Sequence, residues 1–361
     1  MRALNVPKRL PGGAAIACAR ALVAVVSSAC FSAPRYEGPR TDHFDGASFR
    51  NLSPIAPGFR DVPPSDVGCE NHPWPFFVET PRFPAPPARV SSGLRVTFVN
   101  HATVLVQLAG INVLTDPVWS QDVGPSRFLG IPRHKQPGIA FDALPHIDAV
   151  VISHNHYDHL DLPTLKRLAA RDHPVVLAGL GTRALLEANG IDGGHDLDWW
   201  QAHAIGTARI TFAPARHWSQ RGLRDRNANL WGSFFIAGPS ESVYFAGDTG
   251  AGPHFRLIRE RLGAPTTALL PVGAYCPRST WHDHHIDPAE AVDAHLALEA
   301  EQSVAVHWGT FQLGEEGIDD PVHALQQVLR ERGIPATRFH VLENGESVQT
   351  ARPAPPQAAA H

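Results

Sequence analysis

The sequence predicts an α/β fold in which β-sheets lie between outer layers of helices. Two observations predict this class. From about residue 93 to residue 345, short β-branched and aliphatic runs alternate with helical stretches, and both halves of this region contain runs and helices. A third observation is a histidine-rich turn directly after one run. It places a candidate site at the carboxyl end of a strand, where α/β proteins build theirs.

The expected strands are short runs rich in Val, Ile and Leu, at 95–99, 103–108, 111–114, 149–152, 175–178, 210–213, 233–237, 243–246, 268–272 and 304–306. Helices are expected at 162–171, 182–189, 254–262, 288–300 and 321–332. Pro163, Pro253, Pro288 and Pro321 stand near helix starts, where the missing N–H costs nothing. We therefore expect one domain over residues 93–345.

The N-terminal segment, residues 1–30, resembles an export signal. Basic residues precede an apolar stretch, and small residues precede Cys30. Cys30 would be the first residue of a lipoprotein, so we expect an exported protein, periplasmic or anchored to a membrane through Cys30 or the apolar stretch. A cytoplasmic protein with a frayed N-terminus is the alternative.

Residues 31–92 are expected to form an extended arm, because their twelve prolines exclude long helices and interior strands. The arm should pack on the body through its aromatic residues, which are Phe44, Phe49, Trp74, Phe76 and Phe77. Residues 346–361 are expected to form a disordered tail.

Composition excludes several classes of protein. With 43% hydrophobic and 18% charged residues, the chain is neither a disordered polymer nor a multi-span membrane protein. Its net charge of −4 provides no bulk positive charge for nucleic acid, so we expect no nucleic-acid partner. Outside residues 1–30 the cysteines are Cys69 and Cys276. Nothing in the sequence places them near each other, and we expect two free thiols, with a disulfide between them as the alternative.

Residues 153–161, Ser-His-Asn-His-Tyr-Asp-His-Leu-Asp, lie between the run 149–152 and a helix. In an extended turn, His154 and His156 point to the same side, and Asp158 and His159 are carried past them. Four ligands in six residues can then hold two metal ions. Imidazole and carboxylate ligands suit zinc, with iron or manganese as alternatives.

Two ions need more than four ligands, and three further candidates stand at strand ends. His217 follows the run 210–213, Asp248 follows 243–246, and His307 follows 304–306. The sequence thus offers seven metal ligands.

The strings His154-Asn-His-Tyr-Asp-His159, Gly247-Asp-Thr-Gly250 and His307-Trp-Gly-Thr310 resemble the metallo-β-lactamase superfamily. That resemblance implies an αββα sandwich with a dinuclear metal site between two sheets. Further strings, Leu114-Thr-Asp-Pro117 and Leu230-Trp-Gly-Ser233 among them, are similar to the N-acyl-phosphatidylethanolamine-hydrolysing phospholipase D family. The similarity covers roughly residues 95–335.

The resemblance implies two Zn²⁺ per chain, one held by His154, His156 and His217, the other by Asp158, His159 and His307, with Asp248 bridging. Asp248 and His285 are the implied catalytic residues. His285 aligns with a histidine near the substrate phosphate, where it could donate a hydrogen bond or protonate a leaving oxygen. A surface loop histidine is the alternative.

The implied activity is that of a zinc-dependent phosphoric diester hydrolase. A metal-bound hydroxide attacks the phosphorus of an N-acyl-phosphatidylethanolamine-like lipid and gives phosphatidic acid and an N-acylethanolamine. Two zinc ions, two carboxylates and a hydroxide leave a positive site, which suits a phosphodiester monoanion. The alternatives are a lactonase or other metal-dependent hydrolase of the same fold, and a non-catalytic lipid- or metal-binding surface protein. A β-lactamase is disfavoured because Asp248, not Cys, stands at the bridging position.

Six more residues are candidates for supporting the ligands or contacting substrate: His101, Asp116, Trp218, Tyr275, His284 and Trp308. The tryptophans could pack behind the ligands or contact an acyl chain. Asp116 could accept from a ligand imidazole or serve as a turn residue, and His101 could support the site or be a core histidine. His284 stands where relatives tend to carry Gln.

Overall fold

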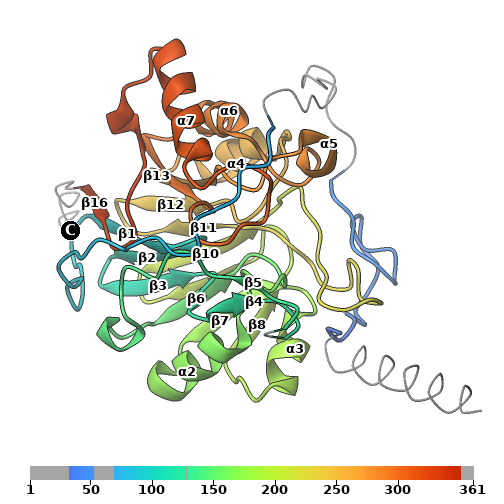
Figure 1. Cartoon of the computed structure of the whole chain (residues 1–361). Coiled ribbons are helices and arrows are strands. Elements are labelled where there is room, and N and C mark those ends of the chain that lie inside the picture. The colour runs from blue at the N-terminus through green and yellow to red at the C-terminus, as the bar shows by residue number, and fades with distance from the viewer. Residues whose placement is uncertain (1–31, 53–68, 127, 351–361) are drawn as a thin grey trace, which may run out of the picture.

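The computed structural model describes residues 32–52, 69–126 and 128–350. Two seven-stranded sheets face each other, and helices cover the outer face of each sheet (Figure 1). The predicted four-layer α/β arrangement is confirmed. The expected export signal at residues 1–30 and residues 351–361 of the expected tail lie outside the described residues.

The first sheet carries most of the N-terminal half of the domain. In spatial order its strands are β16 (Ser347–Thr350), β1 (Leu94–Asn100), β2 (Thr103–Leu108), β3 (Ile111–Thr115), β6 (Ala149–Ile152), β7 (Val175–Gly179) and β8 (Gly194–Leu197). β2 pairs antiparallel with both β1 and β3, and β3 pairs parallel with β6. Consequently β1, β3 and β6 run in one direction and end at the same edge of the sheet.

The second sheet carries the C-terminal half. Its order is β15 (Phe339–His340), β14 (Gln302–Val306), β13 (Thr267–Pro271), β12 (Ser242–Phe245), β11 (Ser233–Ala237), β10 (Ala208–Ala213) and β9 (Ala202–Ile205). β12, β13 and β14 are parallel, and β10 runs with them because β11 is antiparallel to both β10 and β12. The carboxyl ends of these strands also meet at one edge.

Helices α2 (Leu162–Asp172) and α3 (Thr182–Ala188) lie on the first sheet, and α4 (His254–Leu262), α6 (Pro288–Ala297) and α7 (Asp320–Glu331) lie on the second (Figure 1). A short helix, α5 (Arg278–Trp281), and a hairpin of β4 (Asp122–Val123) and β5 (Ile131–Pro132) are additional elements. α6 begins with a reciprocal capping box between Asp287 and Glu290.

The alternation of side chains along β1 and β2 explains why two separate cores form. Val96 and Phe98 of β1 point into the core between the sheets, whereas Val99 and Leu105 point into the core beneath α2 and α3. All six residues of β2 are buried, as expected for a strand covered on both faces. The continuous apolar runs in the sequence therefore correspond to strands at the centre of four layers.

The arm follows the prediction in part. In the described segments 32–52 and 69–92 it forms no helix or strand, and Phe44 and Phe49 are buried in the larger hydrophobic core cluster. Trp74 donates its indole N–H to the carbonyl of Glu316 at 2.8 Å. The expected packing is wrong for Phe76 and Phe77, which are exposed, because the arm is held there by backbone contacts.

The predicted tail begins too early. Residues 347–350 form β16, which pairs antiparallel with residues 94–97 of β1. The prediction missed this strand because Ser-Val-Gln-Thr has no strong apolar alternation. β16 forms because β1, which is distant in the sequence, supplies the backbone hydrogen bonds of the pair.

The expectation of two free thiols is wrong. Cys69 of the arm and Cys276 of the loop after β13 form a disulfide, with Cα atoms 5.4 Å apart across a sequence separation of 207 residues. Sequence spacing could not reveal the pair, because folding of both sheets is what brings the arm beside this loop. The bond ties the arm to a loop close to the edge where the strands end.

We predict that the Cys69–Cys276 disulfide stabilises the folded state by about 2–4 kcal/mol, since it closes a long loop in the unfolded chain. Chemical denaturation with and without a thiol reductant measures this difference. Cys276→Ser should have the stability of the reduced protein and should not respond to the reductant. Equal unfolding free energies of the oxidised and reduced wild type would contradict the prediction.

Candidate metal centre

The candidate site begins on the turn after β6. β6 is buried along its whole length, so its end is fixed in the core. Ser153 follows, and the turn then carries His154, His156, Asp158 and His159 before α2 starts. Three of these four side chains are buried, and that of His156 is partly exposed. The local sequence therefore brings ligands to the edge where the strands of both sheets end.

A first group combines this turn with the segment after β10. His154 Nε2 lies 2.7 Å from His156 Nδ1, and His217 Nε2 lies 3.3 Å from the same atom. The three ring nitrogens converge closely enough to share one cation. This is the first of the two predicted ligand sets.

A second group combines the turn with the segment after β14. His159 Nε2 lies 3.1 Å and His307 Nε2 3.5 Å from Asp158 Oδ2. These are the ligands predicted for the second ion. His101, which follows β1, joins them with its Nε2 3.0 Å from the same oxygen.

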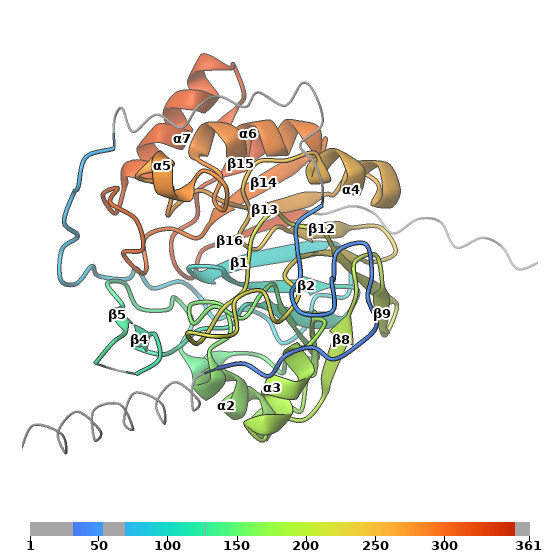
Figure 2. The ribbon, with the colours of Figure 1, turned by 90° about the vertical axis from the view of Figure 1, so that its right-hand side faces the viewer.

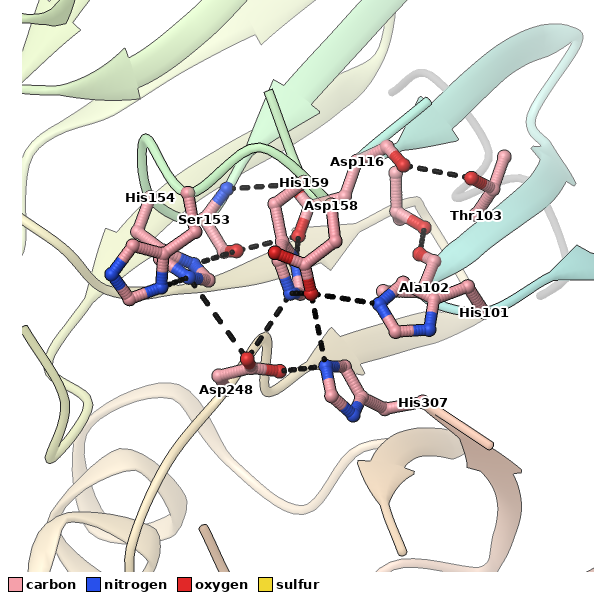
Figure 3. Close-up of polar contacts among 12 residues, drawn as sticks. His101, Ala102, Thr103, Asp116, Ser153, His154, Asp158, His159, Asp248 and His307 are labelled. Carbon is pink, nitrogen blue, oxygen red and sulfur yellow. Dashed lines mark hydrogen bonds and ion pairs between the residues drawn. The ribbon is translucent and has the colours of Figure 1, made fainter. Parts of the chain in front are cut away.

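Asp248, after β12, stands between the two groups (Figure 3). Its Oδ2 lies 3.9 Å from the Nε2 atoms of both His154 and His217 and 3.1 Å from His159 Nε2. Its Oδ1 lies 3.2 Å from His307 Nε2. The carboxylate thus faces both groups, the position expected of a bridging ligand.

Hydrogen bonds behind the ligands orient two of the imidazoles. Asp116 Oδ2 lies 2.7 Å from His159 Nδ1, and the same carboxylate accepts from the backbone and hydroxyl of Ser153 (Figure 3). His217 Nδ1 lies 2.9 Å from the carbonyl oxygen of His284. When Nδ1 carries the proton, Nε2 presents its lone pair to the centre. Asp116 thus has the supporting position that the sequence offered as one alternative.

Three site residues directly after strands adopt a left-handed backbone: His101 with φ 46°, Asp116 with φ 30° and His307 with φ 62°. Such a conformation costs non-glycine residues about 1–3 kcal/mol and concentrates at functional sites. The carbonyl of His101 accepts the backbone N–H of His307 at 2.7 Å. His101 therefore contacts the second group through both its backbone and its side chain.

Gly247 precedes Asp248 and also has a positive φ, 60°. A Cβ at this position would lie 2.5 Å from Ser153 Cβ. A glycine is therefore required where the turn that carries Asp248 passes the turn that carries the histidines. The two sheets meet at this close approach.

Burial and neighbouring charges shift the pKa values of the cluster in opposite directions. Burial and the adjacent His159 lower the pKa of His154 well below its usual value, and burial lowers the pKa of His156 to about 3. Burial also disfavours charged His307, but Asp248 and Asp158 outweigh it and raise the pKa of His307 to about 9. The carboxylates thus attract positive charge into a buried site.

The donor set fits metal ions. His159 Nε2, His307 Nε2 and Asp248 Oδ1 face the centre, are buried and have no hydrogen-bond partner within the described ranges. Unpartnered buried polar atoms are costly, and here they are imidazole nitrogens and a carboxylate oxygen, which are zinc ligands. Cations between the two groups would satisfy them.

The structure places the remaining predicted site residues as follows. His285 is buried with its Nε2 3.8 Å from Asp248 Oδ2, so it belongs to the centre and not to a surface loop. His284 is half-buried and contributes its carbonyl to His217. The Trp218 ring contacts the His156 ring at 4.3 Å between centroids, whereas Trp308 packs in the inter-sheet core.

Tyr275 lies on the loop after β13, beside the disulfide. The backbone N–H groups of Ala274, Tyr275 and Cys276 all donate to the carboxylate of Glu316. Burial raises the pKa of Tyr275 further above its usual value, so its phenol stays protonated. The loop is thereby fixed near the centre by a buried acid that the sequence did not single out.

Asn51, at the end of the first described part of the arm, is a second supporting residue that the sequence analysis did not identify. Its side-chain amide donates to the carbonyl of His217 at 3.0 Å and accepts the His217 N–H at 3.1 Å. Trp231 also donates to Asn51 Oδ1 at 2.8 Å. No motif surrounds Asn51, and only the folded arm shows that it positions a candidate ligand.

Comparison with known proteins identifies the family. Residues 111–308 match the family described as the beta-lactamase superfamily domain. The chain belongs to this superfamily. The matched range contains all seven predicted ligands and every strand that carries one.

The resemblance to the phospholipase D family is also confirmed. The chain is 37% identical over 268 residues to N-acyl-phosphatidylethanolamine-hydrolyzing phospholipase D 1 of Caenorhabditis elegans, covering 71% of this chain and 75% of that enzyme. An uncharacterized protein of Mycobacterium tuberculosis is 42% identical over 65% of this chain and 64% of its own length. The mitochondrial yeast enzyme of the same name is 36% identical, but the match spans only 49% of it.

Solved structures show the same fold. A metallo hydrolase of Ignicoccus hospitalis matches with a TM-score of 0.56 at 23% identity, over 73% of this chain and all of that one. The diiron β-hydroxylase CmlA of Streptomyces venezuelae matches with a TM-score of 0.53 at 19% identity, over 73% of this chain and 55% of that one. At these identities the likeness concerns the fold alone.

We predict that Asp116→Asn weakens metal binding by about 10–100-fold, because the amide cannot replace both carboxylate oxygens that hold His159 and Ser153. Competition with a chelator measures the affinity. Asp172→Asn is the matched control, since Asp172 also accepts a backbone N–H, from Ile147, at a distance from the centre. Unchanged metal affinity in Asp116→Asn would show that this carboxylate does not support the site.

Proposed function

We propose that this chain is a dizinc phosphodiesterase of phospholipase D type. Its substrate is a glycerophospholipid like N-acyl-phosphatidylethanolamine, and its products are phosphatidic acid and an N-acylethanolamine. The observation that carries the proposal is the convergence of two three-residue groups around Asp248 at the edge where both sheets end. The relatives named as phospholipase D support the substrate class, and a metal-dependent hydrolase of Methanopyrus kandleri supports the hydrolase class.

The proposed ligands are the two groups described above, with Asp248 shared between them. When bound, two zinc ions would lower the pKa of a water to about 7 and stabilise charge on the phosphate oxygens. Asp116 and the His284 carbonyl hold His159 and His217 in the tautomer that presents Nε2. Burial of the centre excludes competing water and strengthens each electrostatic contact.

His285 is the proposed residue for contact with the substrate phosphate. Its carbonyl accepts from Arg278 at 2.9 Å, and its ring packs edge-on against Trp281 at 5.1 Å between centroids. These contacts fix an imidazole at the rim of the centre, where it can donate a hydrogen bond to a phosphate oxygen or a proton to a leaving oxygen. Trp218 stands beside His156 and is the proposed contact for the apolar part of the substrate.

We also propose that the protein is exported. The Cys69–Cys276 disulfide supports this, because structural disulfides persist in oxidising compartments and are rare in the cytosol of most organisms. No helix within the described ranges combines the length and apolar composition that a membrane span requires. Lipid attachment at Cys30 would provide the anchor.

A lactonase or another metal-dependent hydrolase of the same fold is the second candidate, because the same two groups could act on a carboxyl ester. Zinc per mole of protein, together with turnover of diester, lactone and β-lactam substrates, separates the candidates. We expect about two zinc ions and turnover of the diester alone. Turnover of lactone without diester would select the second candidate.

Asp248→Ala should abolish diester turnover and reduce bound zinc, because it removes the only carboxylate placed between the two groups in the described chain. Metal analysis and the diester assay give the two readouts. Asp283→Ala is the control, since this exposed carboxylate pairs with Arg216 outside the cluster. Wild-type turnover by Asp248→Ala would exclude the proposed mechanism.

Export predicts a processed N-terminus. We expect mass spectrometry of the protein from its native host to show a mature chain that starts at Cys30 with attached lipid, or that starts close to it without lipid. Cys30→Ser should lose the lipid mass and appear in the soluble fraction. A full-length chain that retains Met1 and residues 2–29 would contradict export.

A further inference from the structure

The loop at residues 219–226, directly after Trp218, combines an exposed leucine with arginines. Leu223 is 83% exposed, and Arg224 and Arg226 are exposed on either side of Asp225. Asp225 is buried, and its carboxylate accepts the backbone N–H groups of Ala33 and Gly222. The Asp225 carboxylate therefore binds backbone N–H groups and does not face solvent, and the solvent-facing side chains of the loop are apolar or positively charged.

Hydrogen bonds within the loop keep Leu223 in its exposed position. The base of the loop is closed by the Asn227 N–H, which donates to the carbonyl of Ser219 at 2.7 Å. The N–H groups of Arg221 and Gly222 donate to Asp225 at 3.2 and 2.8 Å. Since each end is fixed, the leucine projects into solvent from an ordered loop.

This loop is joined to the candidate metal centre. The Arg226 guanidinium lies 4.2 Å above the Trp218 ring, and that ring contacts His156. Arg221 lies 3.9 Å above the Tyr157 ring, and the Tyr157 hydroxyl donates to the Arg221 carbonyl at 3.0 Å. Whatever binds the loop is thus within reach of the centre.

A groove of about 840 Å³ continues the surface from Arg221 toward the β4–β5 hairpin. Residues 120–126, α2 and α3 line it, with Lys166 of α2 as a further cation. At the end of the hairpin, Phe128 is 81% exposed and Leu129 is also exposed. β4, β5, α2 and α3 lie together in the lower half of Figure 2.

The arm adds a pair of exposed aromatic side chains near the hairpin. Phe76 is 93% exposed, and Phe77 is exposed beside it. His134, two residues after β5, donates its N–H to Thr310 and its ring to the carbonyl of Pro75, and its own carbonyl accepts the Val78 N–H. The second described part of the arm, from residue 69 onward, and the hairpin lie on the left side of Figure 2.

We propose that these segments form one surface that docks on an anionic phospholipid bilayer. The docking surface consists of Phe76, Phe77, Phe128, Leu129 and Leu223 with the exposed cations Lys166, Arg224 and Arg226. It holds five of the nine exposed large hydrophobic residues in the described chain. Apolar side chains that enter the interface, flanked by cations that attract lipid phosphates, are the requirements for interfacial binding.

The place of the surface favours a bilayer as its partner. Ser32, where the described chain begins, lies against Gly222 and lines the same groove. The surface borders the centre that must receive a lipid, and this part of the argument rests on the proposed function. Binding to the bilayer itself requires no turnover and can be measured alone.

The test is sedimentation of the full chain with vesicles of phosphatidylcholine, with or without phosphatidylglycerol. Leu223→Asp and Phe128→Asp should each weaken binding to the anionic vesicles by about tenfold or more, because each removes apolar area and adds a repelled charge. Arg224→Gln should weaken it by about fivefold on anionic vesicles only. The matched control is Leu296→Asp, at a 51% exposed leucine on α6 in the opposite helical layer (Figure 2).

A soluble short-chain diester provides the second readout. Leu223→Asp should hydrolyse it at the wild-type rate and lose activity only on vesicle-borne lipid. Equal vesicle binding by wild type, Leu223→Asp and Phe128→Asp would overturn the docking surface, even where diester turnover holds. A change of oligomeric state in these variants without a change in vesicle binding would assign the surface to a protein partner and also overturn it. Vesicle binding that depends on Leu223 in a chain without diester turnover would support the docking surface and refute only the proposed function.

Discussion

The buried cluster of imidazoles and carboxylates around Asp248 is the constraint on which the structure depends. Ring nitrogens and a carboxylate oxygen that have no hydrogen-bond partner among the described residues are held face to face in a low-dielectric interior. This arrangement persists only where the surrounding scaffold fixes each group and a cation can satisfy them. The two sheets provide the scaffold, because their strand ends meet at one edge and each end delivers one part of the cluster.

Several contacts outside the cluster exist to hold these strand ends. Left-handed backbone at His101, Asp116 and His307 turns the chain sharply at the ends of β1, β3 and β14. Asn51 of the arm forms hydrogen bonds with the backbone of His217. The Cys69–Cys276 disulfide and the Glu316 carboxylate together hold the loop after β13. A proline-rich segment with little regular structure is therefore part of the site's support.

The loop after His217 connects the chemistry to the surface. The Trp218 ring contacts His156 on one side and Arg226 on the other, and Tyr157, which follows His156 in the chain, packs against Arg221. The same short stretch thus carries a candidate ligand and an exposed leucine. Such an arrangement suits an enzyme whose substrate lies in a lipid interface, since docking and positioning of the lipid then depend on one ordered segment.

The sequence by itself determined ten of the strands, five of the helices and the seven candidate ligands, and its family resemblance implied the αββα class; β8, β9 and β15 were not predicted. Continuous apolar runs indicate strands that are buried on both faces. Ligands that directly follow such runs lie close together, because the carboxyl ends of parallel strands meet at one edge of the sheet. Tertiary structure alone decided the Cys69–Cys276 pair, the place of Asn51, the strand 347–350, and the exposure of Phe76 and Phe77. These features depend on contacts between segments far apart in the chain, and no local pattern of polarity, propensity or spacing records such contacts.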